Sequence, residues 1–268
     1  MKKPSPQAAW PEQWRNAFAY DQEEVFGPIQ TLGYAYAYQN RQRATLDLVK
    51  AHVPAGGNLL DVAAAQGNFS LLLAEAGYQV TWNDLRGDLV DYVKEKYEFG
   101  DLSYAVGDVF GLGFNACFDA VLITEIIEHV AHPDEFLKKI SCMVRPGGCV
   151  IMTTPNGAYF RNKLPRFSDC VDPSQYEKNQ FKPNSDGHIF LLWPDETISL
   201  AEKAGLRVIE QWFLTTALTN GHVKTSILLK LFPRRVIFLL ERLAQLAPRY
   251  VRRKIMAQTA ICYQRLRD

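Results

Sequence analysis

Three aspartates in this sequence each follow a stretch with the pattern of a buried strand, and carboxylates in such places can bind a polar ligand. They are Asp61, Asp84 and Asp108. Because the carboxyl ends of neighbouring parallel strands meet at one crevice, we expect the three side chains to face a common ligand. Asp84 could accept hydrogen bonds from two ribose hydroxyls, and Asp108 from an exocyclic adenine amine with Val109 against the ring. One acidic residue after a strand is usually a turn residue, but three in order favour a nucleoside site.

The first of these aspartates lies in the stretch from Asn58 to Ser70, where an apolar run leads into three alanines, a glycine and a polar helix start. Small residues let the backbone approach a ligand, and free N–H groups at the start of a helix can meet an anionic group. Asp61 can hold this turn or receive an ammonium group. We interpret the stretch as a strand, a ligand-binding turn and the beginning of a helix.

A second group of reactive side chains follows the apolar run from Phe118 to Thr124. Glu125 and Glu128 are three residues apart, so they share one face of a helical turn, and His129 adjoins them. These three residues could hold a divalent ion such as Mg²⁺, or they could cap a turn. His129 could also act as a general base. His188 could complete the metal site, contact an acceptor, or only hydrogen-bond to the backbone.

The elements that position these residues alternate between apolar runs and helical patterns, as in an α/β domain with a parallel sheet. Strands are expected at 58–63, 78–83, 102–106, 118–124, 149–154, 206–214 and 258–266. The alternation stops after Pro155. A loop of more than thirty residues inside a compact domain usually has a function, so we expect residues 156–190 to form a substrate loop or lid.

Five motifs in order resemble the class I S-adenosylmethionine-dependent methyltransferases. They lie within residues 40–214 and read LLDVAAAQGNF, TWND, VGD, FDAVLITEIIEHV and VRPGGCVIMTTPN. The resemblance implies a seven-stranded, mostly parallel, doubly wound sheet whose last strand is antiparallel. It also implies that Asp84 holds the ribose, Asp108 the adenine and the 61–67 loop the methionine end. The expected cofactor-binding residues are Asp61, Ala63, Ala65, Gly67, Asp84, Leu85, Asp108, Val109 and Thr124.

The glycine-rich loop of that family typically reads DxGxGxG, and this sequence departs from it. Alanine occupies two of the glycine positions, at Ala63 and Ala65. A methyl group at Ala65 restricts the approach of the backbone to a ligand and disfavours a positive φ. The departure therefore bears on cofactor affinity, whereas the fold does not depend on it. The spacing GxGxxG of dinucleotide-binding oxidoreductases is absent from the sequence.

The resemblance also divides the chain. We expect one methyltransferase domain over residues 1–268, with an aromatic, helical N-terminal arm at 1–50 and a cofactor-binding half at 51–155. After the loop at 156–190 comes a C-terminal half, 191–268, with a helical insertion at 222–249 before the last strand. The string E-x-x-E-H is similar to that of ubiquinone-biosynthesis O-methyltransferases and of small-RNA terminal 2′-O-methyltransferases, where such residues bind a metal.

Charge is unevenly distributed along the chain, although the formal net charge is only +1. Residues 222–268 contain eleven Lys and Arg against two Asp and Glu, which favours a peripheral membrane surface or self-association as the partner of this segment. A solvated helix face is the simpler alternative. The basic residues alternate with leucines, so nucleic acid is disfavoured.

Five cysteines without a CxxC pair, and no apolar segment after the N-terminal lysines, favour the cytoplasm.

Three functions remain open from the sequence. The first is a methyltransferase that uses S-adenosylmethionine and acts on a small molecule, at a hydroxyl oxygen, with His129 and His188 as the catalytic residues. The second is an RNA-terminal 2′-O-methyltransferase that uses the basic segment. The third is a non-catalytic domain of the same fold, and it is favoured only by Ala65.

Overall fold

The computed structural model describes residues 1–180, 187–220 and 225–267. Seven strands form one sheet in the order β3-β2-β1-β4-β5-β7-β6. Only β7 runs against its neighbours, pairing antiparallel with both β5 and β6 within the described residues. The expected mostly parallel sheet with an antiparallel last strand is therefore confirmed. The strands are β1 (Asn58–Val62), β2 (Gln79–Asp84), β3 (Asp101–Val106), β4 (Phe118–Thr124), β5 (Val144–Pro155), β6 (Leu206–Thr216) and β7 (Met256–Arg265).

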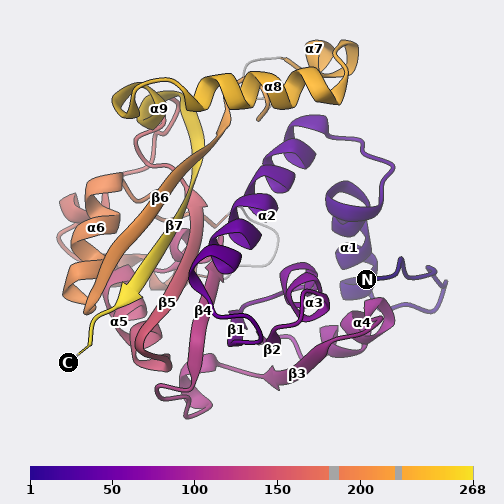
Figure 1. The fold of residues 1–268 in the computed structure, drawn as a ribbon, viewed down its shortest axis with the longest axis horizontal. Coiled ribbons are helices and arrows are strands. Elements are labelled where there is room, and N and C mark those ends of the chain that lie inside the picture. The colour runs from indigo at the N-terminus through magenta and orange to yellow at the C-terminus, as the bar shows by residue number, and fades with distance from the viewer. Residues whose placement is uncertain (181–186, 221–224, 268) are drawn as a thin grey trace.

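Helices cover both faces of the sheet, so the central strands are buried on both sides (Figure 1). On one face lie α1 (Glu12–Asp21), α2 (Leu32–His52), α3 (Asn68–Glu75) and α4 (Leu89–Lys96), and on the other α5 (Pro133–Met143) and α6 (Pro194–Lys203). Strand β4 illustrates how a central strand is buried on both sides. Val121 and Ile123 pack in the core under α5 and α6, whereas Ala120 and Leu122 pack under α2 and α3. A parallel strand buried on both faces needs such a continuous apolar run.

The helical insertion before the last strand consists of three helices, α7 (Ser226–Leu231), α8 (Arg234–Gln245) and α9 (Arg249–Ile255). It extends beyond the expected end at residue 249, and residues 221–224 lie outside the described ranges. Pro233 and Pro248 immediately precede α8 and α9. Because proline lacks an N–H and cannot continue a helix, each one separates two helices that the apolar pattern alone merges.

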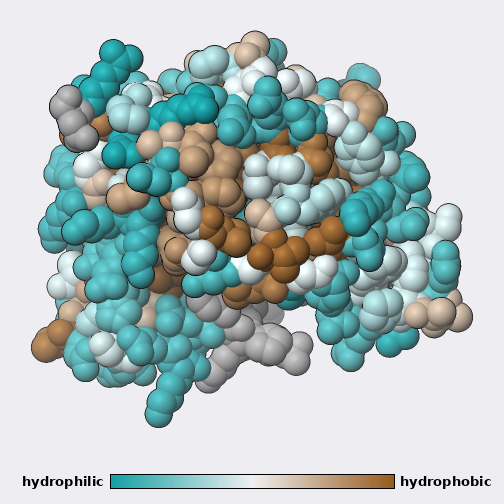
Figure 2. All heavy atoms as spheres, turned by 90° about the horizontal axis from the view of Figure 1, so that it is seen from below, coloured by the Kyte–Doolittle hydropathy of each residue, from teal (hydrophilic) through white to brown (hydrophobic). Residues whose placement is uncertain are grey.

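The insertion lies across one end of the molecule, at the top of Figure 1. Figure 2 shows the opposite end, where hydrophilic residues surround a central group of apolar residues. Helix α2 begins at Leu32, so the last aromatic residues of the expected N-terminal arm, Tyr34, Tyr36 and Tyr38, belong to this helix. Its first turns pack against the insertion, where the Tyr36 and Phe238 rings lie 5.8 Å apart.

Candidate functional site

The carboxyl ends of β1, β2 and β4 lie side by side, and the turn after β1 is bound directly to the end of β2. The Ala65 N–H donates to Asp84 Oδ2 at 2.9 Å, and the Ala64 N–H donates to the Asn83 carbonyl at 2.8 Å. Thr124 ends β4, the other neighbour of β1. The topology thus brings the residues expected around the cofactor to one edge of the sheet.

The turn after β1 adopts a left-handed backbone at three of its residues. The φ angles are +50° at Ala63, +47° at Ala65 and +72° at Gly67. Gly67 has a second constraint, because a Cβ atom there would lie 2.9 Å from a methyl carbon of Val93. The two alanines therefore take the conformation that the family's glycines take easily, at a conformational cost to each.

Replacing Ala65 with glycine should raise the free energy of unfolding by about 1 kcal/mol, because glycine adopts a positive φ without strain. Ala64→Gly is the matched control. Ala64 lies in the same turn but has no positive φ, so its substitution should lower stability by about 0.5 kcal/mol. Urea unfolding of the two variants measures both effects. If Ala65→Gly proved less stable than the wild type, the strain assigned to this turn would be wrong.

Asp61 is buried beneath the turn. Its Oδ2 accepts a hydrogen bond from Ser70 Oγ at 2.6 Å, whereas Oδ1 is buried without a partner among the described residues. Burial raises the pKa of this carboxyl to about 7. A carboxylate with one unsatisfied buried oxygen is suited to bind a cationic group, which would stabilise its ionised form.

Asp84, the expected ribose ligand, is buried at the end of β2 and is held by Arg86. The Arg86 guanidinium donates from Nε to Oδ1 at 2.9 Å and from Nη2 to Oδ2 at 3.0 Å, and the Arg86 N–H also donates to Oδ1. Asp84 therefore has no free acceptor site for ribose hydroxyls while this pair persists. The Arg86 side chain is 53% exposed, so it can swing into water at little cost.

The other expected cofactor residues surround this edge. Asp108 is exposed and caps a short 3₁₀ helix by accepting the Phe110 N–H at 3.1 Å, which leaves its second oxygen available. Val109 is buried in the core next to it. Leu85, which follows Asp84, is 62% exposed, so its side chain is available to contact a planar ring.

Glu125 follows β4 in a strained backbone conformation, with a φ of +55°. Its Oε2 accepts from Arg41 Nη1 at 3.0 Å, and its Oε1 is buried without a partner among the described residues. Arg41 extends from the middle of α2. Glu125 is thus held in an ion pair with α2, and it does not belong to the group formed by the other predicted metal ligands.

Glu128, His129 and His188 form a separate group, in which the potential ligand atoms all lie within 4.8 Å of one another. The backbone brings them together, because the Ile189 N–H donates to the Glu128 carbonyl at 2.7 Å and so fixes the end of the long loop. Glu128 is fully buried. Its Oε2 accepts from Thr154 at 3.0 Å, and its Oε1 has no partner among the described residues. Burial, with the nearby Glu125 charge, raises the pKa of Glu128 well above its usual range.

A buried polar network joins the N-terminal arm to the turn after β1, which we refer to as the cofactor turn. Lys96 Nζ donates to Asp21 Oδ2 at 2.7 Å and to the Gln66 carbonyl at 2.8 Å, and both side chains of this ion pair are fully buried. Asn68, at the start of α3, donates to Asp21 at 2.9 Å and to Glu24 at 3.0 Å. The arm therefore fixes the position of the turn as well as covering the sheet.

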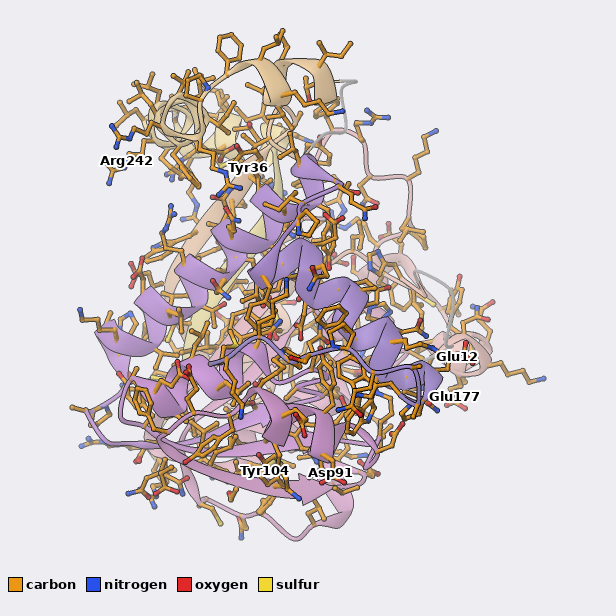
Figure 3. The ribbon with its side chains drawn as sticks, turned by 90° about the vertical axis from the view of Figure 1, so that its right-hand side faces the viewer. Glu12, Tyr36, Asp91, Tyr104, Glu177 and Arg242 are labelled. Carbon is orange, nitrogen blue, oxygen red and sulfur yellow. The ribbon has the colours of Figure 1, made fainter. Side chains whose placement is uncertain are left out.

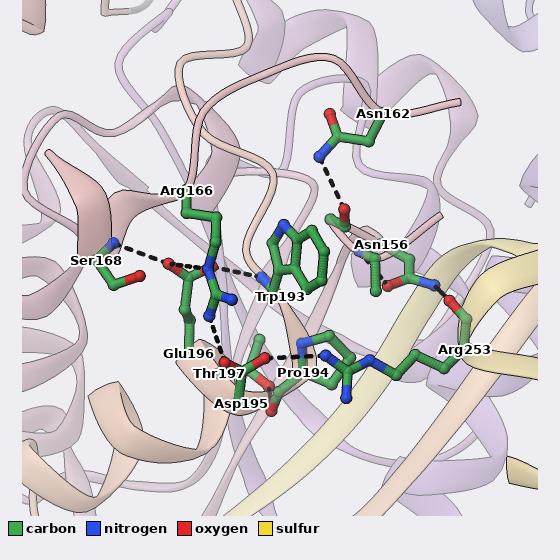
Figure 4. A network of polar contacts seen from close by, with 12 residues as sticks. Asn156, Asn162, Arg166, Ser168, Trp193, Pro194, Asp195, Glu196, Thr197 and Arg253 are labelled. Atoms are coloured by element: carbon green, nitrogen blue, oxygen red, sulfur yellow. Dashed lines mark hydrogen bonds and ion pairs between the residues drawn. The ribbon is translucent and has the colours of Figure 1, made fainter. Parts of the chain in front are cut away.

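The loop after β5 is held to α6 and α9 by a charged cluster, shown in Figure 4. Arg166 and Arg253 both bind Asp195, the latter at 3.2 Å. The two guanidinium groups lie 4.7 and 5.6 Å from the Trp193 ring centre. Two short 3₁₀ helices, Phe167–Asp169 and Pro173–Asn179, are the secondary structure of the expected loop between residue 156 and residue 180.

A cavity of about 400 Å³ lies on the other side of α2, between that helix, β6 and α8. Arg43, Asp47, Trp212, Phe238 and Arg252 are among the residues that line it. None of the site residues expected from the sequence lines this cavity. The cavity is therefore distinct from the group of residues expected to do chemistry.

Sequence reasoning missed the basic partners of these carboxylates. Arg86 lies only two residues after Asp84, so its pairing was readable from the sequence. Arg41 lies 84 residues before Glu125, and nothing local indicates that pair. Lys96 did carry a signal, because it shares the buried face of α4 with Leu89 and Tyr92. A charged residue at such a position needs a buried partner.

The strand order and the reversed β7 define the fold of the class I methyltransferases. A solved structure with this fold is Burkholderia thailandensis 1,6-didemethyltoxoflavin-N1-methyltransferase, described with bound S-adenosylhomocysteine. It has a TM-score of 0.54 and 13% identity, with 98% of this chain and 94% of that chain covered. A family model described as a methyltransferase domain matches residues 34–211, which is more than half of the chain. The chain therefore belongs to this family.

Two relatives are ubiquinone biosynthesis O-methyltransferases. The protein from Xanthomonas axonopodis pv. citri is 34% identical over 169 residues, covering 61% of this chain and 68% of that protein. The protein from Coxiella burnetii (strain Dugway 5J108-111) is 28% identical over 158 residues, covering 58% of this chain and 65% of that protein. The chain thus spans slightly less than two thirds of the length of this second relative.

Proposed function

We propose that this protein transfers a methyl group from S-adenosylmethionine to a hydroxyl oxygen of a small molecule. The observation that carries the proposal is a set of carboxylates at one sheet edge, each with one buried oxygen that has no partner among the described residues. They are Asp61, Glu125 and Glu128. Such oxygens are costly unless a ligand satisfies them, and a cationic ligand does so best.

The residues present fit this cofactor group by group. Asp61 would receive the ammonium, Asp84 would accept from the ribose hydroxyls once Arg86 moves away, and the free oxygen of Asp108 would accept from the adenine amine. Val109 and Leu85 offer apolar contact to the ring. S-adenosylmethionine supplies a methyl group already activated on a sulfonium, so the protein needs chiefly to align the donor and the acceptor.

The hydroxyl of an acceptor must lose its proton as the new bond to carbon forms. His129 and His188 lie next to each other, with ring centres 4.9 Å apart, and neither ring is buried. An imidazole with a pKa near neutrality can take that proton when it is in the neutral form. The small-molecule, O-directed form of the proposal is supported by this placement and by the names of the two relatives.

The test is calorimetric titration of S-adenosylmethionine between pH 5.5 and 8.5, on the wild type and on Asp61→Asn. Below a pH of about 7, Asp61 must lose its proton before it can pair with the ammonium. Affinity should therefore rise about tenfold per pH unit up to that point and fall again as the α-amino group deprotonates near pH 8. In Asp61→Asn, the rise of affinity between pH 5.5 and about 7 should be absent. No binding at any pH would end the proposal.

We also infer a divalent cation at Glu128, His129 and His188. Imidazole ligands favour a transition metal such as Zn²⁺ or Mn²⁺ over the Mg²⁺ expected from the sequence. Such an ion would take the place of the imidazole base, because a coordinated imidazole has no nitrogen left to accept a proton, and it would lower the pKa of a bound acceptor hydroxyl instead. Glu125 could join only by leaving Arg41. Calorimetry with Mn²⁺ and Zn²⁺ should detect one site in the wild type and at least tenfold weaker binding in His188→Ala, with His132→Ala as the unaffected control. Equal binding by the wild type and His188→Ala would exclude the site.

A further inference from the structure

The insertion α7–α9 contains half of the exposed large apolar side chains in the part of the chain that the structure describes. Nine of the eighteen exposed large apolar side chains among the described residues lie between positions 227 and 250 of this insertion. They are Ile227, Leu228, Leu231, Phe232, Leu239, Leu240, Leu243, Leu246 and Tyr250. We refer to these nine residues as the apolar row. Clustered exposure of this kind marks an interaction surface, whereas single exposed leucines are ordinary.

Helix α8 shows that the exposure follows one face of a helix. Its buried residues, Ile237 and Glu241, face the body of the molecule. Leu239, Leu243 and Leu246, with spacings of four and three residues, lie on the opposite face, and Leu246 is 80% exposed. The helix is therefore apolar on the side that the protein does not cover.

The charges around the apolar row are almost all positive. Six basic side chains of the insertion are exposed: Lys230, Arg234, Arg235, Arg242, Arg249 and Lys254. The only acidic residue between positions 225 and 255 is Glu241, and it is buried, with its Oε1 accepting from the Thr216 N–H at 2.8 Å. Figure 3 shows Arg242 to one side of Tyr36, at about the same height in the view. An anionic, apolar partner complements this surface.

We propose that α7–α9 lie flat on a lipid bilayer with an anionic surface, with the apolar row in the boundary between headgroups and acyl chains. Helices with leucines on one side and arginines and lysines at the flanks bind membranes in this way. The helices lie on the bilayer and do not cross it, since no helix within 1–180, 187–220 and 225–267 is both long and apolar enough to span one.

The charge and the apolar row argue against two other partners for this surface, a second copy of the chain and RNA. A second copy placed on the same face would bring two strongly basic surfaces together, and nothing acidic on that face would compensate. RNA would meet the cations but would leave the leucines in water. Only an anionic bilayer pairs with the basic side chains and also buries the leucines. This inference does not depend on the methyl-transfer proposal, because it concerns a surface outside the candidate site.

The test is co-sedimentation of the full chain with vesicles of phosphatidylcholine alone and of phosphatidylcholine with 30% phosphatidylglycerol, in about 0.1 M salt. The wild type should pellet with the anionic vesicles and remain in solution with the neutral ones. A Leu239→Gln, Leu243→Gln, Leu246→Gln variant should lose at least tenfold in partitioning. Arg234→Glu, Arg235→Glu, Arg242→Glu should abolish binding to anionic vesicles.

A matched control is Leu112→Gln with Leu164→Gln, because these leucines are exposed elsewhere on the molecule. This control should bind as the wild type does. All variants change exposed side chains, and their circular dichroism should match that of the wild type. Failure of the wild type to pellet with anionic vesicles would overturn the proposal, as would undiminished binding by the triple glutamine variant. Sedimentation equilibrium showing a dimer that this variant abolishes would assign the face to a second copy instead.

Discussion

Asp84→Ala is expected to weaken the binding of S-adenosylmethionine at least about 100-fold. Each hydrogen bond from a hydroxyl to a buried carboxylate contributes about 1.5–3 kcal/mol, and the variant loses two such bonds. The wild type gives up its pair with Arg86 to bind the ribose, but that arginine is half-exposed and costs little to displace. Calorimetry with S-adenosylhomocysteine, which has the same ribose, measures the loss without turnover.

Asp88→Ala serves as the matched control. Asp88 lies four residues further along the chain, is exposed and makes no capping hydrogen bond, so cofactor affinity should not change. Arg86→Met gives an opposite expectation. It removes the group that competes for Asp84, so binding should become a few-fold tighter. If Asp84→Ala bound the cofactor as well as the wild type did, the assignment of the ribose to Asp84 would be untenable.

The second large effect is expected in stability. Lys96→Met should lower the free energy of unfolding by about 3–5 kcal/mol, because it leaves the Asp21 carboxylate buried without its cation. It also removes the bond from Lys96 to the Gln66 carbonyl, so the cofactor turn should loosen and affinity should fall. Equilibrium unfolding in urea and calorimetry on the same preparation separate the two consequences.

Lys94→Met is the control for that experiment. Lys94 lies on the same helix and pairs with Asp91 at the surface, so its loss should cost less than about 1 kcal/mol. The double variant Lys96→Met, Asp21→Asn removes the unpaired charge and should recover more than half of the lost stability. If Lys96→Met unfolded at the same urea concentration as Lys94→Met, the buried pair would not be what stabilises this arm.

The strands could be predicted from the sequence because their signal is local. Residues Phe118–Thr124 form a mainly apolar run of strand length, and the structure gives β4 the same bounds. The turns after β1 and β2 were predicted by their small and acidic residues. The start of α2 at Leu32 was not, since Tyr34 to Tyr38 were interpreted as part of a separate aromatic, helical arm, whereas the structure buries Tyr36 and Tyr38 within α2.

The pairings across the crevice could not be predicted, because they depend on how distant segments meet. His188 lies next to His129 only because the Ile189 N–H donates to the Glu128 carbonyl, and the sequence places these residues about sixty positions apart. The ion pair that keeps Glu125 from this group depends on the packing of α2 against β5 and β6. Such pairs depend on the topology of the fold, and no short stretch of the sequence carries that information.

Helix α2 is one unbroken rod that contacts two distant regions. Near its start, Tyr36 packs on Phe238 of α8, and one and a half turns later Arg41 holds Glu125 at the end of β4. The same helix therefore contacts both the insertion and the end of β4, so a displacement of its first turns would also move Arg41. We expect binding at one of these two regions to change the ion pair at the other, and this can be tested by measuring each affinity with the other ligand present.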